Sequence, residues 1–486
     1  MKTLRGKEKT IFQMGGEGKR GMDLPKPEGL APIAISGPCM RSTTPDLPDL
    51  SEIEVVRHFT RLSKLNYGVD DGFYPLGSCT MKHNPKINEL IASLDGFKWS
   101  HPMLPYGMVQ GTLKAMKMLE DALNEITGMD GCSLQPAAGA HGELTGVMMI
   151  RACLEKRGNP RQFILIPDSA HGTNPASSAF SGYEVKEVAS DETGCVDLAK
   201  LEEVLDENVA GMMLTNPNTL GIFEKNIQKI ADMLHEKGAL LYMDGANMNA
   251  MMGKARPGEL GVDVMHLNLH KTFSTPHGGG GPGAGPVCFL KHMAPFQPAP
   301  VVDGEGGYHK LDWNRPDSIG KVHGFYGNFL VALKALAYIL SLGGKGLEQS
   351  TEDAVLAANY IRASLKDNFH VPFDIPTLHE VVFNDKKQAE FGISTLDIAK
   401  RLIDYGIHPP TIYFPLIVHG ALMVEPTESE SKEEMDYFIE IMKKVAKEAS
   451  ISPELLHDAP HDTPVRRLDE TKAARNLVLR YGGGDE

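Results

Sequence analysis

The chain has 486 residues, of which 42% are hydrophobic and 23% are charged, so it is long enough for two or three folded domains. Its net charge of −14 argues against general nucleic-acid binding. We recognise neither a cleavable leader nor an apolar run of the ~18 residues that a membrane span requires. The six cysteines form no CxxC pair, which predicts reduced thiols in a cytoplasm and no metal site.

The N-terminal region combines an arm, a helix and a long loop. Residues 1–50 are rich in glycine and proline, which predicts an extended arm lying on another surface. A helix is predicted to begin after Ser51, a suitable N-cap. Residues 66–85 mix aromatic, glycine and polar residues, and long loops of this kind are usually functional, so we interpret them as an active-site loop, with a surface linker as the alternative. Its candidate site residues are Tyr74, Ser78 and Cys79, of which Cys79 is also considered as a nucleophile.

A small-residue loop precedes a helix in the next part of the chain. Residues 109–127 have amphipathic spacing and are followed by Gly128, which predicts a helix with a glycine C-cap. Residues 133–143 then lead into another helix predicted over 144–154. Small residues at a helix start expose several backbone N–H groups together, which favours an anion. We therefore assign a phosphate to Ala138, Gly139 and Ala140, with close packing as the alternative.

Strands and helices alternate from about residue 130 to residue 290, which is typical of a mostly parallel sheet in an α/β protein. Strands are predicted at 162–167, 183–188, 210–214, 238–243, 262–267 and 286–290, with helices at 197–205 and 227–237. Polar motifs follow strand ends repeatedly, where such sheets bind ligands, at 138–143, 171–174, 215–218, 244–247 and 270–277.

Lys271 has the surroundings of a reactive amine. It follows the strand at 262–267, stands between His270 and Thr272, and precedes the glycines of 278–283. Burial lowers the pKa of an amine, so that it can attack a carbonyl and form a Schiff base. Glycine backbone lets a bulky ligand approach the main chain. The alternative is an ordinary lysine on a glycine-rich turn.

Asp244 ends an apolar run and precedes Lys271 by roughly the length of one βαβ unit. An aspartate at the end of a buried parallel strand points into the crevice where open sheets bind ligands. Pyridoxal phosphate (PLP) needs both groups, a lysine to bind covalently and an acid to keep the pyridine nitrogen protonated. A helix N-cap is the alternative for Asp244 alone. His171, just past another strand end, is placed to lie flat over an aromatic ring, although a lone histidine is more often structural.

The C-terminal part predicts a smaller α/β domain. Residues 295–324 are irregular and polar. Helices are predicted at 329–341, 352–365, 395–405 and 431–449, strands at 379–383 and 421–425, and an extended tail from residue 460. We therefore divide the chain into an arm with the active-site loop (1–110), a large domain (111–325), a small domain (326–455) and a tail (456–486).

Three long motifs together resemble the P-protein family of the glycine cleavage system: residues 270–283, 168–176 and 74–82. The resemblance covers nearly the whole chain and implies a fold-type I PLP enzyme with glycine dehydrogenase (aminomethyl-transferring) activity. Such an enzyme decarboxylates glycine, releases CO2 and passes the aminomethyl group to the lipoyl arm of the H-protein. The chain is similar to the lysine-bearing subunit of the split form of the family. The implied partner is a homologous subunit without the lysine, in an α2β2 tetramer.

The resemblance also implies roles for single residues. Lys271 would bind PLP covalently, Asp244 would pair with the pyridine nitrogen, and His171 and Ala246 would lie on the two ring faces. The remaining assignments are Ala138, Gly139 and Ala140 with help from His270 at the phosphate, Asn216 near the ring hydroxyl, Thr173 at the cofactor, and His277, Tyr74, Ser78 and Cys79 as contacts to substrate or lipoyl arm.

The chain departs from the single-chain form of the family at Ala137 and Ala138, where that form has Asn and Ser. A hydroxyl would then be missing from the phosphate cradle, which leaves more of the binding to backbone N–H groups. We expect no strong arginine clamp on the glycine carboxylate, because tight binding of a departing group would raise the barrier. Another fold-type I enzyme, such as an aminotransferase or cysteine desulfurase, and a non-catalytic companion subunit are the rival classes.

Overall fold

The computed structural model describes residues 8–479 except 17, 24, 26–27, 30–36, 44, 46 and 280–282. Part of the predicted glycine-rich run after Lys271 and the last residues of the tail lie outside the described residues. The chain divides into two compact units, Met1–Asp71 and Gly72–Glu486, and each is described by itself.

The first unit contains short elements and one longer helix. These elements are α1 (Ile11–Met14), the 3-10 turn η1 (Gly37–Cys39) and α2 (Glu52–Ser63). Ser51 caps α2 in a reciprocal capping box with Glu54, as its sequence predicts. The Lys19 side chain donates to Glu54 at 2.6 Å and so joins the arm to this helix.

The second unit is built on a seven-stranded sheet in the order β1-β7-β6-β5-β4-β2-β3. Within this sheet β7 runs antiparallel to both of its neighbours, and the other pairs are parallel. The prediction of a mostly parallel α/β sheet is therefore confirmed. The strands are β1 (Gly131–Ser133), β2 (Phe163–Pro167), β3 (Glu184–Val188), β4 (Val209–Thr215), β5 (Leu240–Gly245), β6 (Val264–Leu267) and β7 (Val287–Phe289).

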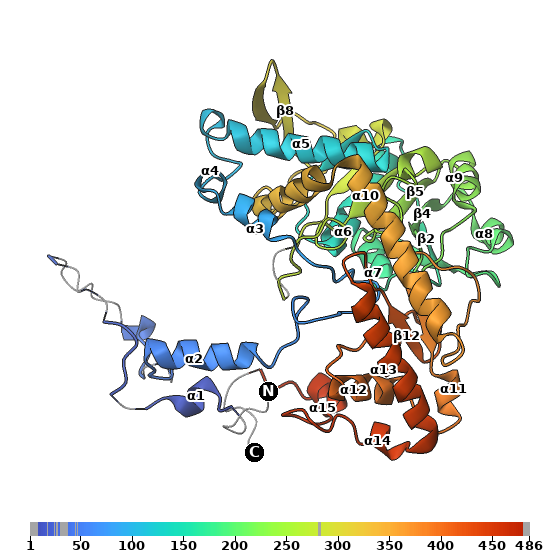
Figure 1. Ribbon diagram of the computed structural model, residues 1–486. Coiled ribbons are helices and arrows are strands. Elements are labelled where there is room, and N and C mark those ends of the chain that lie inside the picture. Colours follow the sequence, from blue (N-terminus) through green and yellow to red (C-terminus); the bar gives the residue numbers. More distant parts are fainter. Residues whose placement is uncertain are drawn as a thin grey trace. The chain divides into compact units, whose positions relative to one another are not determined.

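Helices cover both faces of this sheet, and each face has its own apolar core (Figure 1). Helix α6 (Gly139–Lys156) packs on one face. The cluster on the other face includes residues of α5 (Gln110–Thr127), α9 (Ile227–Glu236) and the first half of α10 (Phe329–Leu365). The remaining helical elements of this part are α3 (Lys86–Ala92), α4 (Asp95–Lys98), η2 (Tyr106–Met108), α7 (Thr173–Phe180), α8 (Leu198–Val204), η3 (Pro257–Leu260) and η4 (Lys291–Phe296).

Strand β5 shows how the two cores divide the sequence. Leu241 and Met243 lie in the cluster that holds α5 and α9, whereas Leu240 and Tyr242 lie in the cluster that holds α6. Side chains alternate along a strand, so Asp244 continues the Tyr242 face. The last polar residue of β5 is therefore directed to the face that α6 covers.

Helix α10 joins the sheet to the C-terminal part of the fold (Figure 1). Gly343 has a φ of 60° and a non-helical ψ, so two helices meet there, between the helices predicted at 329–341 and 352–365. By length and composition α10 passes the criteria for a membrane-crossing helix, with mean hydropathy 1.4 over its most apolar window, and half of that window is buried in the fold. The expectation that the chain contains no such apolar run is wrong by composition.

A second, three-stranded antiparallel sheet forms the centre of the C-terminal part, in the order β10-β12-β11. Its strands are β10 (Val381–Asn384), β11 (Thr411–Ile412) and β12 (Ala421–Val424), and its helices are α11 (Lys386–Ala389), α12 (Thr395–Asp404), α13 (Lys432–Ile451) and α14 (Glu454–His457). The two sheets fit the proposed large and small domains, whose boundaries stay predictions.

Three sequence predictions differ from the structure. The region predicted as irregular contains a hairpin, β8 (Val301–Glu305) and β9 (Tyr308–Asp312), with Gly306 and Gly307 at positive φ in its turn. Helix α6 begins at Gly139 instead of Leu144, because small residues enter a helix when a tight contact favours it. The tail predicted as extended contains α15 (Glu470–Arg475), capped by Asp469.

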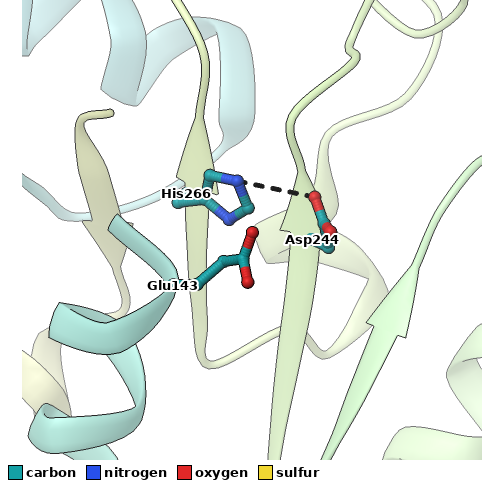
Figure 2. A group of neighbouring side chains, drawn as sticks. All are labelled: Glu143, Asp244 and His266. Atoms are coloured by element: carbon teal, nitrogen blue, oxygen red, sulfur yellow. Dashed lines mark ion pairs between the residues drawn. The ribbon is translucent and has the colours of Figure 1, made fainter. Parts of the chain in front are cut away.

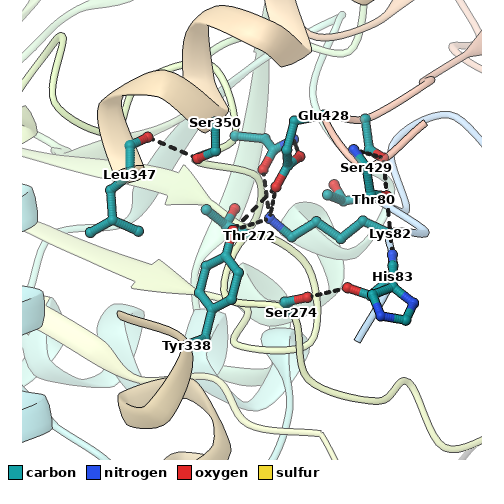
Figure 3. A network of polar contacts seen from close by, with 12 residues as sticks. Thr80, Lys82, His83, Thr272, Ser274, Tyr338, Leu347, Ser350, Glu428 and Ser429 are labelled. Atoms are coloured by element: carbon teal, nitrogen blue, oxygen red, sulfur yellow. Dashed lines mark hydrogen bonds and ion pairs between the residues drawn. The ribbon is translucent and has the colours of Figure 1, made fainter. Parts of the chain in front are cut away.

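A buried ion pair fastens the predicted active-site loop to the rest of the second unit (Figure 3). Lys82 is 4% exposed, and its Nζ donates to Glu428 at 2.6 Å, to Tyr338 at 3.1 Å and to Asn249 at 3.2 Å. Burial opposes the charge on Lys82, but Glu428 outweighs it and raises the pKa of the amine. All three donor positions of the ammonium are thus satisfied.

We expect Lys82→Met to destabilise the protein by about 3–5 kcal/mol, because it leaves Glu428 buried without its cation. The measurement is denaturant unfolding. Lys82→Met with Glu428→Gln should lose less than the single variant, since the orphaned charge is gone. Lys200→Met, in an exposed pair with Glu203, is the control and should keep the parental midpoint. A Lys82→Met midpoint equal to the control would contradict this account.

Candidate active site

A pocket lies at the carboxyl ends of β4 and β5, where an open parallel sheet binds ligands. We name it the Lys271 pocket. Its described lining residues are Ser78, His171, Thr215, Pro217, Asn218, Thr219, Asp244, Ala246, Asn247, Lys271, His379 and Glu380. The structure thus brings together five residues chosen from the sequence: Ser78, His171, Asp244, Ala246 and Lys271.

Lys271 follows β6 and is held in place by its neighbours. The Thr272 hydroxyl accepts a hydrogen bond from the Met248 N–H at 2.8 Å, which ties the chain after β6 to the chain after β5. The Lys271 Nζ donates to the Ser78 carbonyl at 2.8 Å. Ser78 has a φ of 64°, a left-handed conformation that costs a residue other than glycine about 1–3 kcal/mol. The active-site loop therefore meets the lysine at a strained position.

Asp244 is a buried carboxylate that hydrogen-bond donors surround. It is 3% exposed, and its Oδ1 accepts from the Ala246 N–H at 3.0 Å. Asn174, with its amide nitrogen toward the carboxylates, donates to Oδ2 at 3.2 Å. Among the described side chains no lysine or arginine forms an ion pair with Asp244, and the His266 Nε2 lies 3.5 Å from its Oδ1. A buried anion without a cation suits a ligand that brings a positive charge.

His266 faces Asp244 with a defined ring tautomer. The two residues are cross-strand partners on β6 and β5, so they share one face of the sheet (Figure 2). Burial raises the pKa of Tyr242 well above its ordinary value, so its hydroxyl, 2.6 Å from His266 Nδ1, keeps a proton that it can donate to that nitrogen. Burial lowers the pKa of His266 to about 4, so the ring is neutral. We therefore assign its proton to Nε2, directed at Asp244.

His171 lies between β2 and α7 and is neutral. Burial lowers the pKa of its ring, although Asp244 acts in the opposite direction. Its Nδ1 lies 2.8 Å from the Thr173 hydroxyl, which fixes the ring orientation. A neutral, oriented imidazole suits stacking on a cationic aromatic ring better than an imidazolium does.

The start of α6 packs tightly against the segment that follows β6. A Cβ on Gly139 would lie 2.4 Å from Asn268 Oδ1, and one on Gly285 would lie 2.0 Å from the Ala138 carbonyl. Close packing, the alternative for these small residues, is therefore observed. The anion reading also fits, because Gly139 and Ala140 are the first residues of the helix and their N–H groups have no intrahelical acceptor. His270, whose buried Nδ1 has no hydrogen-bond partner among the described residues, lies beside Gly283 at this end.

Glu380, from the small sheet, lines the Lys271 pocket, and Glu425 lies beside it. Val381 of β10 pairs with Val424 of β12, so Glu380 and Glu425 lie side by side at the end of the sheet. Glu380 accepts from the Ser78 N–H at 2.7 Å, and Glu425 accepts from the Thr80 N–H at 2.9 Å. Burial raises the pKa of both carboxyls, and Glu425 raises that of Glu380 further.

Nine residues chosen from the sequence lie outside the lining of the Lys271 pocket: Ala138, Gly139, Ala140, His270, Cys79, Asn216, Thr173, Tyr74 and His277. The Asn216 Oδ1 accepts from the Glu224 N–H at 3.0 Å, and its neighbours Thr215 and Pro217 reach the pocket instead. Among the others are Tyr74, stacked on His408 at 3.8 Å, Thr173, which donates to Glu143 at 2.8 Å, and His277, which donates to the Cys79 carbonyl at 3.0 Å. Their roles at a cofactor or substrate stay predictions.

Sequence reasoning missed several polar residues at this site. Glu143 closes a small-residue motif, where it was grouped with the phosphate loop. Glu380 and Glu425 stand in strand-like segments more than 300 positions from the loop that they hold. A charged residue at the end of an apolar strand was a signal for both, but their pairing needed the sheet register.

The chain matches known proteins over its whole length. Two family models match: "Aminotransferase class-V" over residues 143–281 and "Glycine dehydrogenase, C-terminal domain" over residues 350–461. A probable glycine dehydrogenase (decarboxylating) subunit 2 from Caldanaerobacter subterraneus subsp. tengcongensis is 57% identical, covering 97% of this chain and 98% of the relative. The protein of the same name from Fervidobacterium nodosum is 55% identical, covering 97% and 99%.

Solved structures share the fold. A glycine decarboxylase (P-protein) of the glycine cleavage system in inhibitor-bound form has a TM-score of 0.70 at 21% identity, covering 83% of this chain and 92% of that one. An apo cysteine desulfurase from Thermococcus onnurineus has a TM-score of 0.61 at 15% identity, covering 78% and 95%. With the class-V match, these likenesses confirm the fold-type I architecture.

We expect the Cys79 thiol to react slowly with iodoacetamide at neutral pH. Burial raises its pKa although Lys271 acts in the opposite direction, so little reactive thiolate is present. Exposed Cys39 in the same chain is the internal control, and its alkylation should be at least about tenfold faster. Mass spectrometry of timed digests measures both rates. Equal rates would revive Cys79 as a nucleophile.

Proposed function

Because this chain belongs to the glycine dehydrogenase (decarboxylating) subunit 2 family, we propose that it binds PLP in the Lys271 pocket and decarboxylates glycine. Identity above 50% over nearly the full chain supports the reaction. The observation that carries the proposal for the site is the meeting of Lys271, Asp244 and His171 in one pocket of a fold-type I protein.

The residues of the pocket fit PLP by their chemistry. When bound, PLP supplies the electron sink that lets the bond between the glycine Cα and its carboxylate break. Lys271 supplies the amine for covalent attachment, and ionised Asp244 stabilises a protonated pyridine nitrogen. His171 would lie against one face of the ring, and the small side chain of Ala246 would leave space on the other.

The phosphate is expected at the start of α6. Ala137 and Ala138 offer no hydroxyl there, so the N–H groups of Gly139 and Ala140 and the helix dipole carry the binding. Neutral His270, whose pKa burial lowers to about 3, adds a ring nitrogen without a protein partner at the same end.

The wall opposite Asp244 is where glycine enters. No arginine stands among the described lining residues, which agrees with weak binding of a carboxylate that has to leave as CO2. Glu380 and Glu425 accept hydrogen bonds from the loop at Ser78 and Thr80 and so hold the Ser78 carbonyl against Lys271. The amine of Lys271, once released from the cofactor, can accept or return a proton there.

The aminomethyl group is expected to pass to a disulfide, the oxidised lipoyl group of the H-protein, without a nicotinamide in this step. The name "subunit 2" of the relatives supports a partner subunit. We infer that this partner is the homologous chain without the lysine, in an α2β2 tetramer. The bacterial relatives of this chain support a cytoplasmic site of action.

Lys271→Ala should abolish the visible absorbance of bound PLP and lower glycine-dependent CO2 release about 1,000-fold or more, because the attachment point is lost. Absorbance spectroscopy and release of labelled CO2 from carboxyl-labelled glycine measure the two effects. Lys254→Ala, which removes a surface pair with Glu348, is the control and should retain both. Full turnover of Lys271→Ala, or labelled glycine that is transaminated without CO2 release, would refute the proposal.

Exchange of labelled bicarbonate into glycine should depend on the partners. We expect the purified chain alone to be slow, the chain with its homologous subunit to be faster, and lipoylated H-protein to add a further stimulation of at least about tenfold. Unlipoylated H-protein is the matched control, because it keeps the protein surface and lacks the disulfide. Equal stimulation by both forms would show that the disulfide is not the acceptor.

A further inference from the structure

Glu143 is a buried carboxyl that the proposed reaction does not use. It stands in the second turn of α6 and is 4% exposed. Its Oε1 accepts from the Thr173 hydroxyl at 2.8 Å, and its Oε2 accepts from the Ser177 hydroxyl at 3.2 Å and from the Asn174 amide at 3.1 Å. Three donors converge on a side chain that forms no ion pair with a lysine or arginine among the described residues, and such an arrangement is costly to build without a purpose.

Two of these donors also contact the groups expected at the PLP ring. Thr173 lies 2.8 Å from His171 Nδ1, and Asn174 donates to Asp244 Oδ2 at 3.2 Å. Glu143 is therefore linked to His171 through Thr173 and to Asp244 through Asn174. Figure 2 shows its carboxyl, carried by α6, directed toward Asp244 and His266 on the sheet.

We propose that Glu143 is a positioning residue for the cofactor ring, which holds Asp244 through Asn174 and His171 through Thr173 and adds its own charge behind Asp244. This inference rests on the proposed placement of the pyridine ring against Asp244. Glu143 itself does not line the Lys271 pocket.

The charge of Glu143 changes near neutral pH. Burial and then Asp244 raise its pKa to about 7, while the hydrogen bonds from Thr173 and Ser177 act in the opposite direction. Lys271 faces it from the pocket side and lowers this pKa slightly. The other titratable groups around it keep one state at this pH, since His171 and His266 are neutral and Tyr242 keeps its proton.

Protonation of Glu143 reverses a short chain of hydrogen bonds. When the carboxylate is ionised, the Thr173 hydroxyl donates to it, and His171 Nδ1 keeps the hydrogen bond from the Thr173 N–H at 3.3 Å. When it is neutral, its O–H donates to Thr173, whose hydroxyl then donates to His171 Nδ1. The ionised form also places a second negative charge behind Asp244, so the hold on a cationic ring is stronger above about pH 7.

The test is the dissociation constant of PLP for the full chain, measured by equilibrium dialysis from about pH 6 to about pH 9. Glu143→Gln keeps the shape of the side chain and removes its charge. Relative to Glu143→Gln, the parental protein should gain about threefold to tenfold in affinity across pH 7. The ligand's own phosphate titration is common to all variants and cancels in this ratio.

Glu120→Gln is the matched control. Glu120 is a carboxyl on α5 that is 3% exposed, and burial raises its pKa to about 8, but it lies outside the Lys271 pocket. Glu120→Gln should therefore keep the parental pH profile. A parental profile in Glu143→Gln, or the same loss in Glu120→Gln, would overturn the proposal.

Two further variants keep the result decisive. If Glu143→Gln does not fold, Ser177→Ala removes one donor to the carboxylate and should move the midpoint of the affinity change to higher pH, and an unmoved midpoint would overturn the proposal. Asp244→Asn should weaken PLP binding at every pH. If it does not, the ring placement is wrong; if it does while Glu143→Gln keeps the parental profile, only the role of Glu143 fails.

Discussion

A negative charge buried at the end of β5 is the constraint on which the site depends. Asp244 has hydrogen-bond donors around it and, among the described side chains, no lysine or arginine ion pair. Donors alone do not offset the loss of hydration of a carboxylate, so the fold stores an unmet demand for positive charge. A protonated pyridine meets that demand. The neutral tautomer assigned to His266 directs its Nε2–H toward the same carboxylate.

Side chains alternate between the two faces of a strand, and this alternation determines which residues lie near Asp244. Tyr242, Asp244 and their cross-strand neighbour His266 share one face, and α6 covers this face. The start of α6 also has to approach the chain after β6 closely, which Gly139 and Gly285 permit. The placement of α6 therefore has two consequences. Its first N–H groups are available to the proposed phosphate, and Glu143, one turn later, is directed toward Asp244.

The sequence predicted the parts of the site that follow their own strands. Asp244 stands at the carboxyl end of its apolar strand, Lys271 and His171 follow theirs by a few residues, and parallel strands bring such residues to one edge. Asn216 satisfied the same rule but turned to the Glu224 N–H, because a side chain amide takes the nearest buried donor. Glu380 and Glu425 were beyond prediction, since a period of two shows a strand but not its partner or register. The hairpin β8–β9 was not predicted, because short polar strands have no distinct apolar face.

The two family models match different parts of the site, and this bears on the specificity proposed above. The class-V aminotransferase match covers Glu143, His171, Asp244 and Lys271, which include the residues proposed to hold the cofactor. The glycine dehydrogenase match covers Glu380, in the lining of the Lys271 pocket, and Glu425 beside it. Because these glutamates accept hydrogen bonds from the strained backbone of the active-site loop, the C-terminal sheet sets the position of the Ser78 carbonyl at the lysine. One fold hosts many reactions, so we expect the selection of glycine to be decided where this sheet and the loop meet beside Lys271.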